Sequence, residues 1–109
     1  MTNRLSQLLL LQKELPNDSF LLFALAKEYE KAKQMNQALD YYLELLNKDP
    51  EYVGTYYHLG KLYEHFEKAA EAFQTYTTGM AVSKKQGDQH SMNELAGARL
   101  NLGDEEDFE

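Results

Sequence analysis

Residues 25–42, LAKEYEKAKQMNQALDYY, return 34 positions later as residues 59–76, LGKLYEHFEKAAEAFQTY. The two stretches share Leu, Lys, Tyr, Glu, Ala and Tyr at matching places, and Pro16 and Pro50 stand the same distance apart. A fixed period of this size is typical of stacked helical hairpins, in which each unit buries its apolar side against its neighbours. The repeat therefore predicts an all-α protein, and such stacks serve more often as binding surfaces than as catalysts.

Helix-forming residues dominate the rest of the chain, and β-branched residues are scarce. With Pro16, Pro50 and Gly87 as stops, we expect helices over residues 3–14, 20–32, 37–47, 53–66, 69–85 and 89–102. The breaks at residues 33–36 and 67–68 contain neither Gly nor Pro. One long helix over residues 53–85, in an antiparallel bundle, is therefore the alternative. The apolar pattern restarts after residue 68, which favours the hairpin.

The repeated residues resemble the tetratricopeptide pattern, in which a bulky residue, Leu-Gly and Tyr are followed by Ala, an aromatic residue and Pro. The first copy reads Leu22, Leu25-Ala26, Tyr29, Ala38, Tyr42 and Pro50, and the second reads Tyr56, Leu59-Gly60, Tyr63, Ala72 and Tyr76, with Lys84 in place of Pro. A third, partial copy has Met92, Leu95-Ala96 and then Arg99 in place of Tyr. The resemblance implies a small bacterial-type stand-alone domain. Its fold would be an α-solenoid of antiparallel hairpins, with about six helices, two full units and flanking half units.

Small residues stand where the pattern brings the two helices of a hairpin close together. These are Ala26 in the first copy and Gly60 in the second. A larger side chain would overpack such a contact, whereas Gly97 is expected on the open side of the last helix. In the first helix, Leu8 and Leu11 are expected to face inward.

Composition and charge exclude several classes of function. The net charge is −7, and five carboxylates in residues 104–109 leave about −2 for residues 1–103. Neither part has the basic stripe that phosphate contacts require, so nucleic acid and anionic membranes are not expected partners. The chain has no cysteine, and its apolar runs are shorter than the roughly 18 residues that span a bilayer. We expect a cytoplasmic protein with one helical domain over residues 1–103 and a disordered acidic tail over residues 104–109.

The resemblance also implies a binding site, because the first helix of each hairpin in this family lines a concave groove. The positions on that side predict a peptide groove with apolar pockets and hydrogen-bond donors. Its candidate residues are Phe20, Phe23, Lys27, Tyr57, His58, Lys61 and Asn93. In the alternative interpretation, Phe20 and Phe23 only pack against the first helix, and the charged residues form a solvated face.

Chemistry beyond binding has little support in the sequence. His58 and His65 lie about 10 Å apart along one helix, too far apart for one metal ion. The chain has no Gly-rich phosphate loop and no serine in an activated context. The site with which members of this family bind a C-terminal carboxylate is not expected here either, because Glu94 would repel a carboxylate. We therefore expect no catalytic residue, no metal and no cofactor.

The sequence thus predicts a non-catalytic adaptor that binds a protein or peptide segment in the groove. The alternative is a structural module that forms a homodimer through its terminal helices, where leucines are left over on the outer faces.

Overall fold

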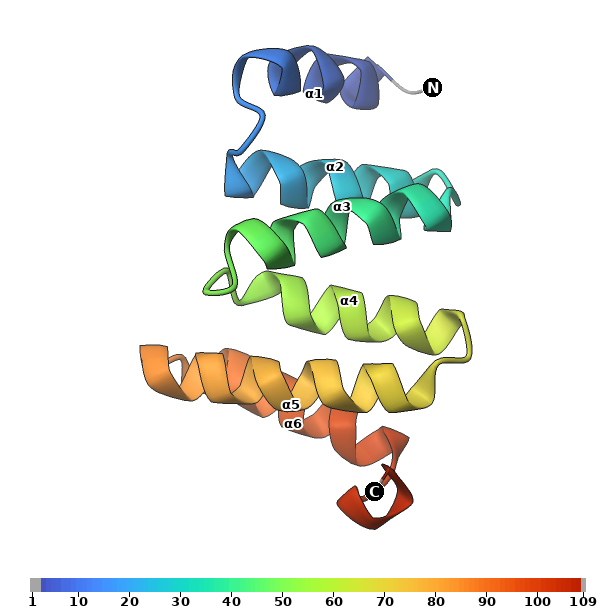
Figure 1. Cartoon of the computed structure of the whole chain (residues 1–109), viewed down its shortest axis with the longest axis vertical. Helices are drawn as coiled ribbons and strands as arrows, with labels where there is room; N and C mark the ends of the chain where they lie inside the picture. The colour runs from blue at the N-terminus through green and yellow to red at the C-terminus, as the bar shows by residue number, and fades with distance from the viewer. Residues whose placement is uncertain (1–2, 109) are drawn as a thin grey trace. The chain divides into compact units, whose positions relative to one another are not determined.

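The structure is a computed structural model that describes residues 3–108. Within these residues all regular secondary structure is helical, and there is no strand (Figure 1). The elements are α1 (Asn3–Glu14), α2 (Ser19–Lys31), α3 (Met35–Lys48), α4 (Gly54–His65), α5 (Ala69–Gln86), α6 (Gln89–Leu102) and the short 3₁₀-helix η1 (Glu105–Phe108). The expected boundaries of the six α-helices lie within two residues of these. This confirms the all-α fold of helical hairpins and excludes the long helix over residues 53–85.

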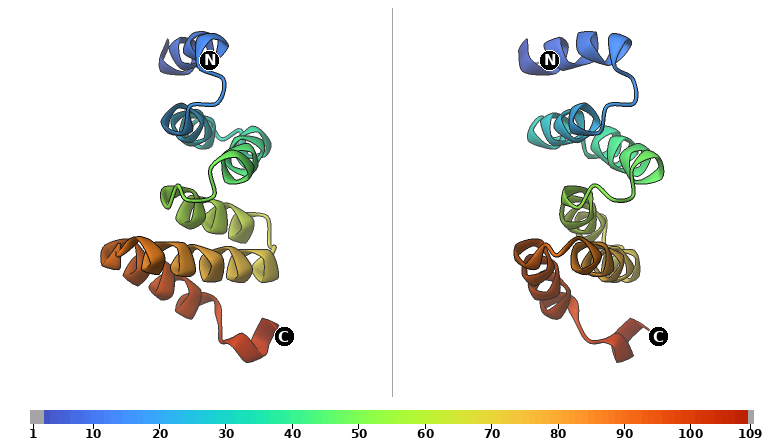
Figure 2. Two further views of the ribbon diagram at one scale, coloured as in Figure 1. Left: turned by 60° about the vertical axis from the view of Figure 1, so that its left-hand side comes forward. Right: turned by 90° about the vertical axis from the view of Figure 1, so that its left-hand side faces the viewer.

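By their internal contacts, the elements divide into two compact units. Unit 1 ends at Tyr52 and contains α1, α2 and α3, and unit 2 begins at Val53 and contains α4, α5, α6 and η1. In unit 1, α2 packs beside α3, and in unit 2, α5 packs against both α4 and α6 (Figure 2). The single domain over residues 1–103 stays a prediction.

One hydrophobic cluster of unit 1 lies between α1 and α2. Leu5 and Leu8 on α1 are buried with Leu21, Ala24 and Leu25 on α2. Leu11 does not join them, because its side chain is 47% exposed. The expectation for Leu11 was wrong. The inward stripe of α1 starts one turn earlier, at Leu5, and Leu11 lies beyond its end.

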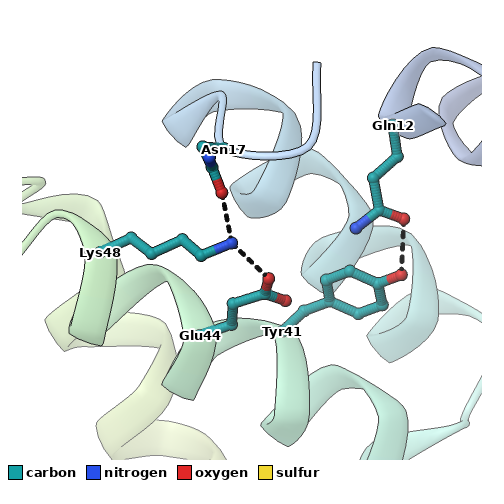
Figure 3. A network of polar contacts seen from close by, with 5 residues as sticks. All are labelled: Gln12, Asn17, Tyr41, Glu44 and Lys48. Atoms are coloured by element: carbon teal, nitrogen blue, oxygen red, sulfur yellow. Dashed lines mark hydrogen bonds and ion pairs between the residues drawn. The ribbon is translucent and has the colours of Figure 1, made fainter. Parts of the chain in front are cut away.

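A polar network adds contacts between α1, the loop after it, and α3 (Figure 3). The hydroxyl of Tyr41 donates to Oε1 of Gln12 over 2.9 Å. Lys48 donates to Oδ1 of Asn17 and to the carboxylate of Glu44, the latter at 2.8 Å. These contacts fix the direction in which the chain enters α2.

Unit 2 depends on close helix contacts at two glycines. A side-chain carbon added at Gly60 on α4 would lie 2.1 Å from the ring of Tyr76 on α5. One added at Gly79 on α5 would lie 2.5 Å from Cβ of Tyr56 and 3.0 Å from Leu95 on α6. Gly60 therefore occupies the expected helix–helix contact, and Gly79 allows α5 to approach both neighbours.

The α2–α3 and α4–α5 hairpins each turn at a residue that is in the left-handed conformation but is not glycine. Lys33 has φ 64° and Glu67 has φ 60°, and the two stand one repeat apart. In both breaks, the next N–H reaches back over five residues: Gln34 donates to the carbonyl of Tyr29, and Lys68 donates to that of Tyr63, each at 2.9 Å. This is the hydrogen bond of a Schellman ending, which stops a helix without Gly or Pro.

A buried tyrosine is held by a glutamate in both hairpins. Tyr42 donates its hydroxyl to Glu30, and Tyr76 donates to Glu64, again one repeat apart. Both rings are fully buried, and burial together with the adjacent carboxylate raises the pKa of both phenols well above the usual range. The recurrence of Glu30 and Glu64 in the sequence thus has a structural cause.

The acidic tail differs from the expectation of disorder. Residues 105–108 form η1, and the ring of Phe108 stacks on Phe73 of α5 with centroids 4.6 Å apart. The prediction of disorder considered only the repulsion among the carboxylates. It did not consider the single aromatic side chain or the hydrogen bond from the Asp104 N–H to Asp107. Glu109 lies outside the described residues.

Candidate functional site

The three candidate residues of unit 1 lie on one side of α2. Asp18 caps the helix by accepting from the N–H of Leu21 over 2.8 Å, which sets where the helix begins. From that start, Phe20, Phe23 and Lys27 follow at helical spacing. They line a hollow of about 410 Å³, which the structure forms from Arg4, Phe20, Phe23, Ala24, Lys27, Glu28 and Lys31.

Inside this hollow, an aromatic ring and a lysine form a pair. Nζ of Lys27 lies 5.5 Å from the ring centroid of Phe23, within the range of a cation–π contact. The Phe23 ring is supported by Tyr52 at 5.4 Å and by Tyr42 at 6.2 Å. Phe20 is 66% exposed, so its ring is open to a ligand.

Unit 2 carries the equivalent pair on α4. Nζ of Lys61 lies 5.6 Å from the ring centroid of Tyr57. Both residues line a hollow of about 250 Å³ together with Asn93, which extends from α6. The full lining consists of Tyr57, Lys61, Asn93, Glu94, Gly97, Ala98 and Asn101. The structure thus brings Tyr57, Lys61 and Asn93 together, as the sequence predicts.

His58 lies in the hollow next to this one, about 280 Å³ in volume. Tyr57 and Glu94 line both hollows, and the rings of Tyr57 and His58 are 5.7 Å apart. All four candidate residues of unit 2 therefore belong to one continuous stretch of surface between α4 and α6. The seven candidates fall into two sets, one on each unit.

The charges at these surfaces are mixed. In unit 1, Arg4 forms an ion pair with Glu28 at 3.5 Å, while Lys27 and Lys31 stand beside it. In unit 2, Lys61 lies 3.8 Å from Glu64, and Glu94 lies 3.7 Å from Nε2 of His90. The pairs of unit 2 are at the surface and therefore weak, whereas the carboxylate of Glu28 in unit 1 is largely buried. Both surfaces therefore combine aromatic rings with charges of both signs.

Two further groups of residues were not among the predicted site residues. Arg4 joins the hollow of unit 1 only because α1 packs across α2, a geometry that no local motif encodes. Phe73 and Arg99 form a separate contact in unit 2, with the guanidinium carbon 5.3 Å from the ring centroid. The unusual Arg99 in the place of the repeat's Tyr is the one signal that could have pointed to it.

Within residues 3–108, no three His, Cys, Asp or Glu side chains come together as a metal site would need. None of the helices described is long and apolar enough to cross a membrane.

Solved structures of other proteins resemble this chain closely. The tetratricopeptide repeat domain protein from Salinibacter ruber, in solution, is 44% identical with a TM-score of 0.77, over 80% of this chain and 88% of that one. A crystal structure of a tetratricopeptide repeat domain protein from Salinibacter ruber is also 44% identical, with a TM-score of 0.76. The match covers 78% of this chain and 96% of that one. The solution structure of a protein from Bordetella parapertussis is 27% identical, with a TM-score of 0.80. The match covers 94% of this chain and 89% of that one. No family model and no curated protein matches the chain.

Proposed function

From the premise that this chain belongs to the tetratricopeptide repeat family, we propose that it is a non-catalytic protein-interaction module. Each unit offers one binding surface for a peptide or protein segment: the α2 surface in unit 1 and the α4–α6 surface in unit 2. The proposal includes a cytoplasmic location, which fractionation of source cells would test.

One observation carries this proposal: the same aromatic–lysine pair occurs on both units. Phe23–Lys27 and Tyr57–Lys61 stand one repeat apart, have nearly equal ring-to-Nζ distances, and each line a hollow. Neither lysine is needed for the core, because both are exposed. A ring beside a cation offers an apolar surface for a partner side chain together with donors for a carbonyl or carboxylate.

Charge reversal tests the proposal. The variant Lys27→Glu/Lys61→Glu should lose capture of partner proteins from source lysate, with an unchanged circular dichroism spectrum. The matched control Lys13→Glu/Lys84→Glu makes the same change in net charge at one exposed site on each unit and should capture as the wild type does. Equal capture by both variants would contradict the proposed surface.

Self-association is the second candidate, and the terminal helices favour it. Leu10, Leu11 and Leu15 at α1 are 63%, 47% and 50% exposed, and Leu100 on α6 is 71% exposed. Exposed leucines gathered on one helix are typical of an interface. A homodimer through these helices would give twice the chain mass in solution at micromolar concentration, and Leu10→Glu/Leu100→Glu would return it to a monomer. A monomer at that concentration in the wild type would rule this candidate out.

A further inference from the structure

The C-terminal segment of unit 2 folds back onto α5. Phe108, the last described residue, stacks its ring on Phe73 with centroids 4.6 Å apart and an interplanar angle of 20°. Phe73 also lines a hollow of about 310 Å³, which α5, α6 and the start of the C-terminal segment form together. The lining of that hollow is Phe73, Ala96, Arg99, Leu100, Gly103, Asp104 and Glu105.

Phe73 and Arg99 are held in place independently of the tail. Arg99 donates from Nη1 to the hydroxyl of Thr77 on α5 over 3.1 Å, and its guanidinium carbon lies 5.3 Å from the Phe73 ring centroid. Leu100 beside them is 71% exposed. We call Phe73, Arg99 and Leu100 the aromatic seat. It combines a ring, a cation and an open apolar side chain.

The turn that returns Phe108 to the aromatic seat depends on one glycine. Gly103 has φ 153°, and a side-chain carbon there would lie 2.8 Å from Oδ2 of Asp107 and 3.0 Å from the Phe108 ring. The same Asp107 oxygen accepts from the N–H of Asp104 over 2.9 Å. A larger residue at position 103 would therefore move the tail away from Phe73.

The contact is nevertheless easy to release. Asp104, Glu105, Glu106 and Asp107 follow one another and repel, and within residues 3–108 the structure gives none of them an ion pair with a cation. The aromatic stack is thus the main attraction, and a single stack is weak. A tethered group this weakly held can be displaced by a partner with similar contacts.

We propose that the aromatic seat binds an aromatic side chain of an acidic peptide, and that Phe108 is its built-in competitor, which leaves before the partner binds. The tail suggests the chemistry of the partner: a ring to stack on Phe73, and carboxylates like those of Asp104 and Glu105. In the part of the chain that the structure describes, these two line the same hollow as Arg99 without pairing with it. The aromatic seat uses none of the residues of the aromatic–lysine pairs, although it shares Leu100 with the alternative homodimer interface. It is a second interaction surface, on which the protein's own tail rests.

Fluorescence can follow the tail directly, because the chain has no tryptophan. In the full chain, Phe108→Trp introduces a single tryptophan at the aromatic seat, which can be excited selectively over the tyrosines. Its emission should lie at shorter wavelength, with weaker acrylamide quenching, than in the matched variant Phe108→Trp/Phe73→Ala, where the ring has lost its partner. Gly103→Ala/Phe108→Trp should behave as the Phe73 variant does. Circular dichroism checks that all three fold.

The second step adds the peptide GDEEDF, the sequence of residues 103–108, from outside. It should shift the Phe108→Trp emission to longer wavelength in a saturable way, while GDEEDA should not. Labelled GDEEDF should also bind the Phe108→Ala chain about threefold to tenfold more tightly than the wild type, because the internal competitor is gone.

Two results would overturn the proposal. Identical emission and quenching in Phe108→Trp with and without Phe73 would show that the tail does not rest on the aromatic seat. A shielded tryptophan that GDEEDF cannot displace, with no binding gain in Phe108→Ala, would show a purely structural contact. Neither measurement involves Lys27 or Lys61, so both test the aromatic seat independently of the proposed function.

Discussion

Glycines of unit 2 differ in what surrounds their missing side chains. At Gly79 an added carbon would meet Cβ of Tyr56 at 2.5 Å, an atom fixed to the backbone that cannot rotate away. At Gly97 nothing lies within 4 Å. A substitution at Gly79 therefore tests helix–helix packing, whereas a substitution at Gly97 tests helix propensity alone.

We expect opposite effects of alanine at these two glycines. Gly79→Ala should lower the free energy of unfolding by about 1–3 kcal/mol through overpacking. Gly97→Ala should raise it by up to about 1 kcal/mol, because alanine favours the helix. Thermal unfolding should show the first variant several degrees below the wild type and the second slightly above it. Equal melting temperatures would contradict the contact at Gly79.

The buried tyrosines predict how stability changes at high pH. Burial, followed by the bond to Glu30 or Glu64, raises the pKa of Tyr42 and Tyr76 in the folded state. Above a pH of about 10, the unfolded chain loses phenolic protons that the folded chain still holds. The stability is therefore fully present below that pH and falls as the pH rises beyond it.

The urea midpoint should accordingly be lower at pH 10.5–11 than at pH 8. In Tyr42→Phe/Tyr76→Phe the rings stay and these two hydroxyls are lost, so the decline between the two pH values should be smaller. At pH 8 this variant should already be less stable, because Glu30 and Glu64 lose a donor in a half-buried site. A wild-type midpoint that is flat up to pH 11 would contradict the account.

At the scale of the element, helix positions were predictable because the repeat, the prolines and Gly87 all act locally. The form of the hairpin breaks was not. Lys33 and Glu67 adopt a conformation that favours glycine, and a sequence rule that looks for Gly finds nothing there. The hairpin contacts hold these residues in place against their own preference, and one sequence does not show such contacts.

Glycine at these breaks should therefore stabilise the protein. A residue with a side chain costs about 1 kcal/mol in the left-handed conformation, and Glu67→Gly removes this cost. Glycine also gains conformational freedom in the unfolded state, which offsets part of that gain in stability. We expect a melting temperature that is unchanged or a few degrees higher. Glu71→Gly, in the first turn of α5, should instead lower it by several degrees, because glycine is a poor helix former and an acidic side chain at the helix N-terminus is lost. A loss of stability in Glu67→Gly as large as that in Glu71→Gly would contradict the assigned turn.

At the scale of the whole molecule, the sequence predicted which candidate residues share a helix face, because helical spacing determines that. Phe20, Phe23 and Lys27 lie together in unit 1, and Tyr57 and Lys61 meet Asn93 in unit 2. Arg4 and the stack of Phe108 on Phe73 were missed, since both depend on how distant segments fold onto a helix. The charge of the tail did not predict its position, because that position depends on the ring of Phe108 and on the turn at Gly103.

The central claim is that partners bind at the two surfaces that carry the aromatic–lysine pairs. Site-specific photo-crosslinking tests it most directly. A photoreactive phenylalanine analogue would replace Phe20 or Tyr57 at these surfaces, and Leu43 on α3 or Gln74 on α5 as exposed controls elsewhere. After irradiation in source lysate, the account predicts heavier adducts with partner protein from positions 20 and 57 and none from positions 43 and 74. Adducts from the control positions alone would contradict it.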